Sequence, residues 1–540
     1  MDLITTGNFN MQTISEMLIR AHHAFQKKDI FEAHNYYSKA LKLDSKNATI
    51  HSNLGTCYIE MKQWQKAFEH FQIGLELDIN HAGIHTNLSH AYRLIGCMPE
   101  AVAHIKKVVA LEPDSPVAQS NLLLYLNYCP NVSSDELFTY HRQWGNRFSM
   151  KPKNQLNFSN YPDPDRPIRL AYISPDFRGH SVGYFIEPAL LHYNPKQFEI
   201  FCYAHVPTPD QTTEKIQKHV NKFYLIHTMN DQQVANQIRA DGIDILVDLS
   251  GHTANSRIRI MTYQAAPIQV TYLGYPTTSG LKHIDYRLTD TVIDPKGSSD
   301  SYFTEQLIYL DPYFFCLSSL GNSLPISPSP ALINKKICFG AFHNTSKVSE
   351  CIIQLWSKVL LQIPESKILL QASAYDDPDI VRYFQTCFEK YGIKRHRVKC
   401  IGTLPFEQYI KLHHQIDIML DTQPWTGHTT SCHALWMGIP ILTLAGTRHA
   451  SRIGQRLLLA LDLKEWIARD HQDFVEKAVN LTKNLSNLNT LRKNMRNRII
   501  ESGISNRSQY VHSLEKAFSQ LWVSWCNEKR SLDHCFGHFS

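Results

Sequence analysis

The sequence predicts an α-solenoid of short helical repeats followed by two doubly wound α/β domains. Two observations carry this prediction: residues recur with a period of 34 over positions 13–148, and short apolar runs alternate with helical segments over 168–525. Runs rich in β-branched residues and Leu, separated by helices, are typical of parallel sheets covered on both faces. At 540 residues the chain is too long for a single hydrophobic core, so several domains are expected.

The period of 34 is visible at several positions in the first third of the chain. Residues of one type recur at this spacing: a small residue, a large aromatic or aliphatic residue, and Leu at two positions. The sets are Ala33/Ala67/Ala101, Tyr37/Phe71/Ile105, Leu43/Leu77/Leu111 and Leu54/Leu88/Leu122. This pattern resembles the tetratricopeptide repeat, in which each unit is a pair of antiparallel helices. Three units are clear, and 115–148 is a degenerate fourth unit that we expect to cap the stack onto the region that follows.

A polar position also recurs at this spacing. Asn53, Asn87 and Asn121 each precede a Leu on the first helix of a repeat. Asn is a poor residue for a helix interior, because its amide competes for backbone hydrogen bonds. A row of amides in a groove would bind the N–H and C=O groups of an extended peptide, and stacked repeats offer a concave surface for such a ligand. We predict a peptide-binding row; the alternative is exposed positions that tolerate Asn.

Two segments divide the chain after the repeats. Residues 149–167 and 316–334 are rich in Pro, Asn and Ser and lack periodicity, so they are predicted to be linkers. One α/β domain is expected over 168–315 and a second over 335–525. The candidate strands are Ile168–Ile173, Phe198–Tyr203, Ile243–Leu249, Ile268–Leu273 and Gln306–Leu310 in the first domain, and Lys336–Phe342, Lys367–Gln371, Val398–Ile401, Ile416–Leu420 and Ile439–Leu444 in the second. A final helix is predicted over residues 508–525.

The stretch from Asp421 to Arg452 predicts a phosphate-binding site. It reads as a strand end, a polar turn, a helix over Ser431–Met437 and a further strand. His428, Thr429 and Thr430 place hydroxyls and backbone N–H groups at the start of that helix. The first N–H groups of a helix lack intrahelical partners and the helix dipole is positive there, so this end attracts phosphate. The stretch therefore indicates the diphosphate site of a nucleotide-dependent enzyme.

Other loops that follow predicted strands carry polar residues, and ligands of open α/β sheets bind at the carboxyl ends of the strands. The candidates are His180, His252, Thr278, Gly280, Asn344 and Lys347. We expect His180 and His252 to face one cleft and to transfer protons, since neutral imidazole suits that role near pH 7. For either one alone, a structural cap is the alternative. Lys347 would neutralise a departing diphosphate without metal, the alternative being a solvated surface charge.

Composition argues against several other classes of protein. A net charge of +6 without a clustered basic stripe speaks against nucleic-acid binding. No apolar run reaches the ~20 residues of a membrane span, and no signal peptide is visible. Twelve cysteines without C-x-x-C pairs favour reduced thiols, so we expect a cytoplasmic protein, with secretion through an unrecognised signal as the alternative.

Two Asp-x-Asp sequences resemble metal-binding motifs. Asp163-Pro-Asp165 and Asp377-Pro-Asp379 both lie in Pro-rich turns. Asp is common in such turns because its carboxylate accepts hydrogen bonds from the backbone two residues on. We therefore expect no metal site.

Several stretches are specific enough to identify a family. ISPDFRGHSVGYFIEP, DILVDLSGHTANSR, APIQVTYLGYPTTSG, HIDYRLTDTVIDP, FHNTSKVS and GHTTSCHALWMGIPILTLAG closely resemble the intracellular O-linked N-acetylglucosamine transferases, including their SPINDLY-type O-fucosyltransferase branch. The resemblance covers 168–525, and repeats followed by such a region are the architecture of the family. We interpret the chain as a bacterial-type member.

The resemblance implies a two-lobed catalytic region of the GT-B type, with an N-terminal catalytic and a C-terminal nucleotide-sugar-binding domain. It implies an inverting, metal-independent transfer of a sugar, foremost GlcNAc from UDP-GlcNAc, to Ser or Thr of acceptor proteins held by the repeats. His180 would lie at the catalytic centre, and Lys347 would contact the diphosphate beside Asn344. His428–Thr430 would contact uracil and phosphate. The nucleotide sugar is a co-substrate, and no other cofactor is implied.

The donor region departs from the family pattern in two places. His433 stands where the family has an acidic residue that holds a ribose hydroxyl, so we count it among the nucleotide contacts. Phe406 and Tyr409 stand in a loop where the animal enzymes use Lys and His against the nucleotide. Two alternatives therefore stay open: an O-fucosyltransferase that uses GDP-fucose, and a catalytically weakened scaffold whose repeats bind a partner.

Overall fold

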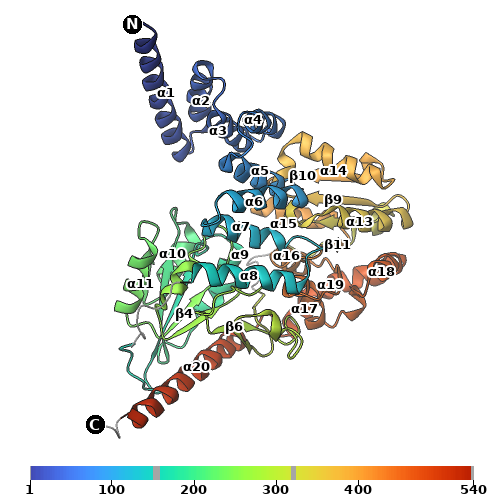
Figure 1. Cartoon of the computed structure of the whole chain (residues 1–540). Coiled ribbons are helices and arrows are strands. Elements are labelled where there is room, and N and C mark those ends of the chain that lie inside the picture. Colours follow the sequence, from blue (N-terminus) through green and yellow to red (C-terminus); the bar gives the residue numbers. More distant parts are fainter. Residues whose placement is uncertain (1, 150–157, 318–323, 537–540) are drawn as a thin grey trace. The chain divides into compact units, whose positions relative to one another are not determined.

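The structure is a computed structural model that describes residues 2–149, 158–317 and 324–536 (Figure 1). Residues 150–157 and 318–323 belong to the two predicted linkers and lie outside the described residues. The predicted fold class is confirmed, because paired helices in the first third of the chain are followed by two parallel-sheet α/β domains.

The chain forms two compact units, and each combines segments that are far apart in the sequence. The first unit contains Met1–Cys129 and Lys336–Tyr409, and the second contains Pro130–Lys335 and Ile410–Ser540. The repeat array therefore shares a unit with the beginning of the second α/β domain. The remainder of that domain shares a unit with the first α/β domain.

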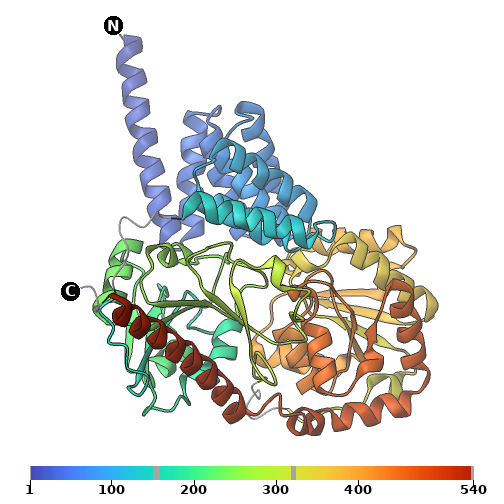
Figure 2. The ribbon, with the colours of Figure 1, turned by 60° about the horizontal axis from the view of Figure 1, so that its bottom comes forward.

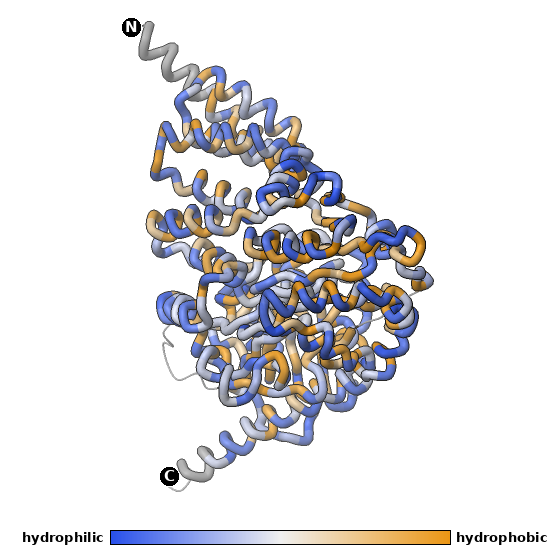
Figure 3. The backbone as a smooth tube through the Cα atoms, turned by 90° about the vertical axis from the view of Figure 1, so that its right-hand side faces the viewer, coloured by the Kyte–Doolittle hydropathy of each residue, from blue (hydrophilic) through white to orange (hydrophobic). Residues whose placement is uncertain are grey.

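The first unit begins with the repeat array, whose helices follow one another as antiparallel pairs (Figure 1). These helices are α1 (Asp2–Gln26), α2 (Ile30–Leu43), α3 (Ala48–Glu60), α4 (Trp64–Leu77), α5 (Ala82–Leu94), α6 (Met98–Leu111) and α7 (Pro116–Leu126). The period of 34 sets their packing, because Ala33, Ala67 and Ala101 are all fully buried. Phe71 and Ile105 fill the same interior one turn later. Hydrophobic and hydrophilic residues alternate along the array, as in helices with one buried face (Figure 3).

The second part of the first unit contains parallel strands separated by helices. They are β8 (Cys338–Ala341), β9 (Lys367–Gln371) and β10 (Val398–Ile401), with α13 (Glu350–Gln362) and α14 (Pro378–Lys390) between them. Strand β8 pairs with β9, and β9 pairs with β10, both in parallel. All of these strands fall on runs that the sequence predicts as strands.

The second unit contains a parallel sheet with the strand order β3-β2-β1-β4-β5-β6-β7. The strands are β1 (Ile168–Ser174), β2 (Phe198–Ala204), β3 (Lys222–Leu225), β4 (Ile245–Asp248), β5 (Ile268–Thr271), β6 (Tyr286–Thr289) and β7 (Gln306–Tyr309). The helices are α8 (Ser134–Phe148), α9 (Ser181–Leu190), α10 (Gln211–Gln217), α11 (Asp231–Ala240) and α12 (Pro330–Asn334). The chain winds outward from β1 on both sides, which is the doubly wound arrangement. The sequence did not predict β3 and β6, because β3 is half exposed and β6 carries the buried Arg287.

The second unit also contains the end of the second α/β domain. Its elements are β11 (Ile418–Leu420), α16 (Thr429–Trp436), β12 (Ile441–Leu444), α17 (Ile453–Ala460), β13 (Ile467–Ala468), α18 (His471–Lys483), α19 (Leu485–Glu501) and α20 (Arg507–Phe536), and α15 (Phe406–Leu412) precedes them. Helix α16 begins two residues before the predicted Ser431–Met437. Helix α20 extends beyond the predicted 508–525 and lies against α9 and β5 of the first α/β domain (Figure 2).

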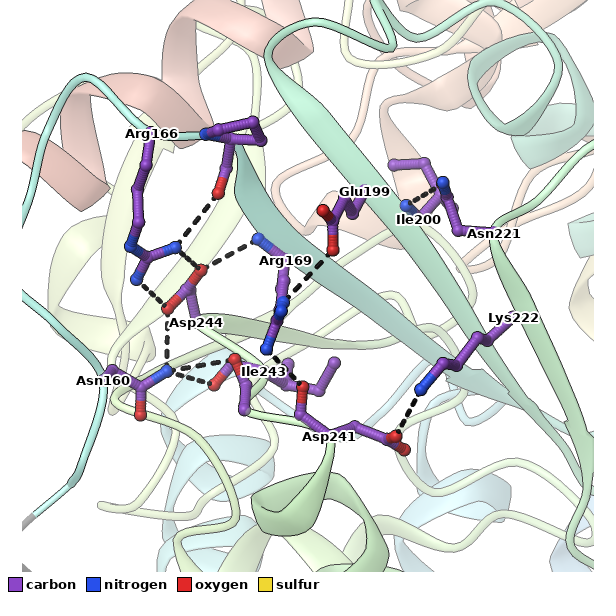
Figure 4. Close-up of polar contacts among 12 residues, drawn as sticks. Asn160, Arg166, Arg169, Glu199, Ile200, Asn221, Lys222, Asp241, Ile243 and Asp244 are labelled. Carbon is purple, nitrogen blue, oxygen red and sulfur yellow. Dashed lines mark hydrogen bonds and ion pairs between the residues drawn. The ribbon is translucent and has the colours of Figure 1, made fainter.

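A polar network holds the segment that precedes β1 (Figure 4). The buried carboxylate of Asp244 accepts two hydrogen bonds from the guanidinium of Arg166, each 2.7 Å long, and one of 2.7 Å from the amide of Asn160. The Arg166 guanidinium also lies 4.6 Å from the ring centre of Trp522 on α20. Two-point Arg–carboxylate contacts are among the stronger hydrogen bonds in proteins. The described end of the predicted linker 149–167 is therefore fixed to the sheet.

Helix α8 packs against the loop that follows β5 with almost no space between the two backbones. A Cβ atom on Gly145 would lie 1.8 Å from the carbonyl oxygen of Gly280. A Cβ atom on Gly280 would lie 2.0 Å from the carbonyl oxygen of His141, and Gly280 has a φ of +76°. Only glycine fits at either position.

We expect Gly280→Ala to lower the free energy of unfolding by about 3 kcal/mol, because left-handed strain of ~1 kcal/mol adds to the overlap with α8. Gly297 is the matched control, since its φ is +79° but a Cβ there would meet nothing within 4 Å. Gly297→Ala should therefore lose only the strain, about 1 kcal/mol. Urea denaturation measures both variants, and equal losses would contradict the predicted contact.

Candidate active site

The loops that carry the predicted site residues of the first α/β domain lie at one edge of its sheet. Strands β1, β4 and β5 are neighbours and parallel, so their carboxyl ends are adjacent. The loop after β1 carries His180, the loop after β4 carries His252, and the loop after β5 carries Thr278 and Gly280. The order of the strands thus brings together segments that are up to 100 residues apart.

His180 is the N-cap residue of α9, and its side chain is 42% exposed. Its Nδ1 atom lies 3.3 Å from the backbone nitrogen of Val182 and 3.3 Å from Oδ1 of Asp176. Burial lowers the pKa of His180, although the Asp176 carboxylate opposes this shift. Burial raises the pKa of Asp176 itself. The imidazole is therefore accessible and largely neutral at pH 7.

The hydrogen bond at Nδ1 sets the tautomer of the neutral His180 ring. The backbone N–H of Val182 donates to Nδ1, so Nδ1 lacks a proton and the proton of the neutral ring lies on Nε2. Asp176 acts on the same nitrogen electrostatically, from a distance of 3.3 Å. Its carboxylate favours the protonated ring and thereby opposes the effect of burial on the pKa of His180.

His252 has a different environment from His180 and does not share its exposure. Its side chain is only 1% exposed, and Nε2 lies 2.8 Å from the carbonyl oxygen of Ser279. Its ring packs edge-on against Trp144 of α8 at 4.5 Å. Burial lowers the pKa of His252 to about 4. These contacts fit a neutral residue that supports the site rather than one that exchanges protons with a substrate.

Thr278 and Gly280 are likewise occupied by structural contacts. The Thr278 hydroxyl is buried and donates to a carboxylate oxygen of Glu305 over 2.7 Å. The backbone N–H of Ser279 donates to the other oxygen of Glu305 over 2.7 Å. Together with the close approach of α8 to Gly280, these bonds fix the loop after β5 as a rigid wall.

The predicted phosphate site lies at the start of α16, as the sequence indicates. His428 is the N-cap residue, and Thr429 and Thr430 are the first helical residues; all three residues are half-buried. The preceding turn is organised by Asp421, whose Oδ1 accepts the Gly427 N–H over 2.7 Å. The start of α16 therefore presents backbone N–H groups in a fixed orientation, which suits an anion.

The His428 ring is held between aromatic side chains from the first α/β domain. It stacks on Phe185 with ring centres 4.0 Å apart and an angle of 16°, and Phe315 lies edge-on to it at 4.5 Å. Phe185 belongs to α9, which begins just after His180. A single helix therefore connects the accessible imidazole of His180 to the start of α16.

His433 lies further along α16 and is nearly buried, with 9% of its surface exposed. Burial lowers its pKa to about 4, so the ring is neutral at pH 7. A neutral imidazole is able to donate or accept a hydrogen bond but lacks the charge of the acidic residue found in the family pattern.

Buried polar contacts connect the loop after β6 with the loop after β12 and with α17. Burial lowers the pKa of His449, so its contact of 2.8 Å with Asp294 is a hydrogen bond from Nδ1 of a neutral ring to the carboxylate. Asp290 forms an ion pair of 2.9 Å with Nε of Arg456 on α17. Arg452 donates to the carbonyl oxygen of Ile293 over 2.9 Å. Removing Asp290 or Arg456 would leave an uncompensated buried charge, so these contacts fix the connected segments relative to each other.

In the first unit, Asn344 precedes the short helical turn Thr345–Lys347 that follows β8, and Lys347 is the last residue of that turn. Asn344 is exposed, and its side chain accepts the backbone N–H of Ser346 over 3.0 Å. Lys347 is half-buried at the end of the turn. Both lie at the carboxyl end of a parallel strand, where the sequence places them.

The predicted Asn row is partly used within the array. The Asn87 amide donates to the hydroxyls of Ser52 and Thr56, 3.0 Å in each case. These bonds connect α5 to α3 of the preceding repeat. Asn53 and Asn121 are half-buried, as is Asn87. The amide N–H groups of Asn87 are therefore engaged by the protein, and its carbonyl oxygen is the group left for a peptide N–H.

Comparison with known proteins gives a consistent result. The model of glycosyl transferase family 41 matches residues 146–320 and 328–514. This chain belongs to that family.

Among curated relatives, the probable UDP-N-acetylglucosamine–peptide N-acetylglucosaminyltransferase SPINDLY of Arabidopsis thaliana is 35% identical over 421 residues, 77% of this chain and 46% of the relative. The SEC protein of Arabidopsis, named for the same activity, is 29% identical over 372 residues, 67% of this chain and 38% of the relative. The chain thus spans less than half the length of these relatives. A solved mutant O-GlcNAc transferase of Thermobaculum terrenum is 27% identical, with a TM-score of 0.88 over 96% of this chain and 99% of that one.

For this family 41 protein, sequence reasoning missed Asp176, Phe185 and the buried polar contacts of Asp290 and Asp294. Asp176 stands four residues before His180 in the SPDFRGH motif, and this spacing was the available signal. The sequence does not indicate a role for Phe185 in the site, because an aromatic residue in an apolar helix is expected to lie in the hydrophobic core. Its contact with His428 depends on how two distant segments pack.

The acidic pairs have the turn roles that the sequence predicts. Asp377 caps α14 and accepts the Asp379 N–H over 2.6 Å, and Asp163 accepts the Asp165 N–H over 3.0 Å. Within the described ranges, no three His, Cys, Asp or Glu residues are grouped so as to hold a metal ion. None of the helices in the described part of the chain has both the length and the apolar character needed to cross a bilayer.

We expect Asp176→Asn to lower the pKa of His180 further, since the Asp176 carboxylate opposes the lowering by burial. Long-range ¹⁵N–¹H spectra of histidine-labelled protein follow the titration of the ring, with His180→Gln assigning the signal. Asp210→Asn is the control, because Asp210 accepts the N–H of Gly179, the residue next to His180, over 2.7 Å. An unchanged titration of His180 in Asp176→Asn would contradict the electrostatic role of Asp176.

Proposed function

We propose that this chain is a protein O-glycosyltransferase that transfers GlcNAc from UDP-GlcNAc to Ser or Thr hydroxyls of acceptor proteins. The observation that carries the proposal is the contact between Phe185 and His428, which joins the helix that begins at the accessible His180 to the start of α16. Membership of glycosyl transferase family 41 and the names of the relatives support this activity.

In this proposal the residues divide the chemistry between a base and an anion site. His180 accepts or orients the proton of the acceptor hydroxyl while that oxygen attacks the sugar from the face opposite the leaving group, so the configuration inverts. The charge that develops on the departing diphosphate is stabilised by Lys347 and by the N–H groups at the start of α16. Asn344 and His428–Thr430 hold the nucleotide, and no metal is required.

His252, Thr278 and Gly280 have supporting roles in the proposal, because their polar groups and backbones are bonded within the loop after β5. His433 contributes a neutral hydrogen-bonding group from the interior of α16 rather than an acid. We also propose that the chain has three functional parts joined by two linkers. The repeats span 13–148, the linkers span 149–167 and 316–334, and the catalytic domains span 168–315 and 335–525. A cytoplasmic location, which suits the free thiols of the described residues, is part of the proposal as well.

His180→Ala and Lys347→Ala are each expected to lower kcat by roughly 100-fold or more, because each removes a group that acts mainly in the transition state. His192→Ala and Lys358→Ala, which change exposed residues of the same types, are the controls. Turnover is measured with radiolabelled UDP-GlcNAc and a cell lysate as acceptor. Wild-type turnover in either site variant would refute its role.

The donor is tested by offering labelled UDP-GlcNAc and GDP-fucose to the wild-type protein in separate reactions. We expect label from UDP-GlcNAc to appear on protein, with the sugar released by β-elimination as from Ser and Thr. If only GDP-fucose labels protein, GDP-fucose is the donor, and the protein is still a glycosyltransferase. No label from either nucleotide, together with no binding of UDP or GDP, would favour a scaffold.

Replacement of Asn53, Asn87 and Asn121 together with Ala is expected to weaken the binding of acceptor peptides by about 10-fold or more, because each amide contributes hydrogen bonds worth ~1 kcal/mol to the peptide backbone. Asn80→Ala, at an exposed loop position, is the control. Fluorescence anisotropy of a labelled peptide measures the affinity. Wild-type affinity in the triple variant would show that these residues serve only the packing of the array.

A further inference from the structure

Within the first unit, turns of the repeat array contact the loops at the carboxyl ends of β8 and β9. The turn between α5 and α6 contacts the loop after β8, which carries Lys347. The turn between α3 and α4 contacts the loop after β9. The carboxyl ends of parallel strands are where ligands bind in open α/β sheets. The array therefore borders the ligand-binding edge of these strands.

The contact with the loop after β8 is made by two hydroxyl groups next to Lys347. Thr345 donates from Oγ1 to the carbonyl oxygen of Leu94, and Ser346 donates from Oγ to the carbonyl oxygen of Arg93 over 2.9 Å. Both hydroxyl-bearing residues are buried. The accepting carbonyls lie at the end of α5, where a helix leaves its last C=O groups without intrahelical partners. The Arg93 carbonyl oxygen also accepts the Gly96 N–H over 3.2 Å, so the loop after β8 bonds directly to the residues that form the α5–α6 turn.

Gly96 allows the turn to approach the loop this closely. Its φ is +83°, and a Cβ atom would lie 2.7 Å from the carbonyl oxygen of Thr345. That same carbonyl accepts the backbone N–H of Val348 over 2.9 Å, which closes the turn Thr345–Lys347. A side chain at position 96 would therefore press on the peptide unit that sets the direction of Lys347.

A second contact fixes the array against the loop after β9. The Lys62 ammonium pairs with the carboxylate of Asp376, and the Trp64 backbone N–H donates to Oδ2 of Asp377 over 3.3 Å. Asp376 also accepts the backbone N–H of Thr403, in the loop after β10, over 2.6 Å. The array is held at two separate points, so the α5–α6 turn is not free to slide along the loop after β8.

We propose that the α5–α6 turn of the repeat array positions Lys347 for the diphosphate of the donor. This inference rests on the proposed function of Lys347. The array then has a second role besides binding acceptor proteins: Gly96, Thr345 and Ser346 act through Lys347 and are positioning residues for sugar transfer. An acceptor that displaces helix α5 would change the affinity of the donor site through this turn.

The test compares two glycines of the first unit that have the same backbone conformation. Gly392 has a φ of +82°, and a Cβ there would meet only Cδ2 of Leu361 at 3.8 Å. Gly96→Ala is expected to weaken UDP binding and to raise KM for the sugar nucleotide by roughly 10-fold, because small displacements of a positioned group cost up to ~100-fold in rate. Gly392→Ala, which carries the same strain without the contact, should bind UDP as the wild type does.

Thr345→Val removes the hydroxyl and keeps the shape, whereas Thr345→Ser keeps the hydroxyl. We expect Thr345→Val to raise KM for the donor more than Thr345→Ser does. The double variant Gly96→Ala/Lys347→Ala tests whether Gly96 acts through Lys347: its UDP affinity should equal that of Lys347→Ala alone. Two residues that act independently would give additive losses.

Isothermal titration with UDP and initial rates with the labelled donor measure these effects on the full chain, and thermal unfolding confirms that each variant is folded. If Gly96→Ala binds UDP as tightly as Gly392→Ala, or if the losses of Gly96→Ala and Lys347→Ala add, the positioning role is refuted while the transferase proposal stands. If the wild-type protein binds neither UDP nor GDP, the proposed function fails and the inference fails with it.

Discussion

The stacking of Phe185 on His428 is the contact on which the geometry of the candidate site depends. Helix α9 begins at the accessible His180 and presents Phe185 little more than one turn later, so the position of one histidine ring determines that of the other. The buried contacts Asp294–His449 and Asp290–Arg456 also fix this geometry, because they join segments from the two α/β domains within one unit. Aromatic stacking and buried polar contacts thus fix where the His180 imidazole and the start of α16 lie.

Helix α8 supports the loops after β4 and β5. Its Gly145 and the loop glycine Gly280 lie so close together that no Cβ fits at either position. Trp144 of the same helix packs on His252, whose burial keeps the imidazole neutral. The last helix of the repeat region is therefore part of the wall beside the candidate catalytic loops, and the histidine after β4 belongs to that wall.

The helices and the turns of the repeat array make contacts through different chemical groups. Its helices bury one apolar face at the period of 34, and half-buried Asn side chains remain between the helices. Its turns use backbone carbonyls and a glycine instead, and these contact the loop that carries Lys347. The array therefore packs internally through side chains, whereas backbone groups of its turns contact the loop after β8.

The sequence by itself determined the architecture and most of the candidate residues. Helical period and apolar runs are local properties, so they predicted the repeats, the loops that bear His180, Lys347 and His428, and the strands other than β3, β6 and β13. Strand β3 is half exposed, β6 carries the charged Arg287, and β13 has only two residues. Tertiary structure alone decided which of these residues are accessible. His180 and His252 both follow strands, yet only His252 is enclosed, because Trp144 comes from a helix more than 100 residues earlier in the chain. Likewise, nothing local to Gly96 indicates that Thr345 lies against it, since burial and close approach arise only when distant segments pack together.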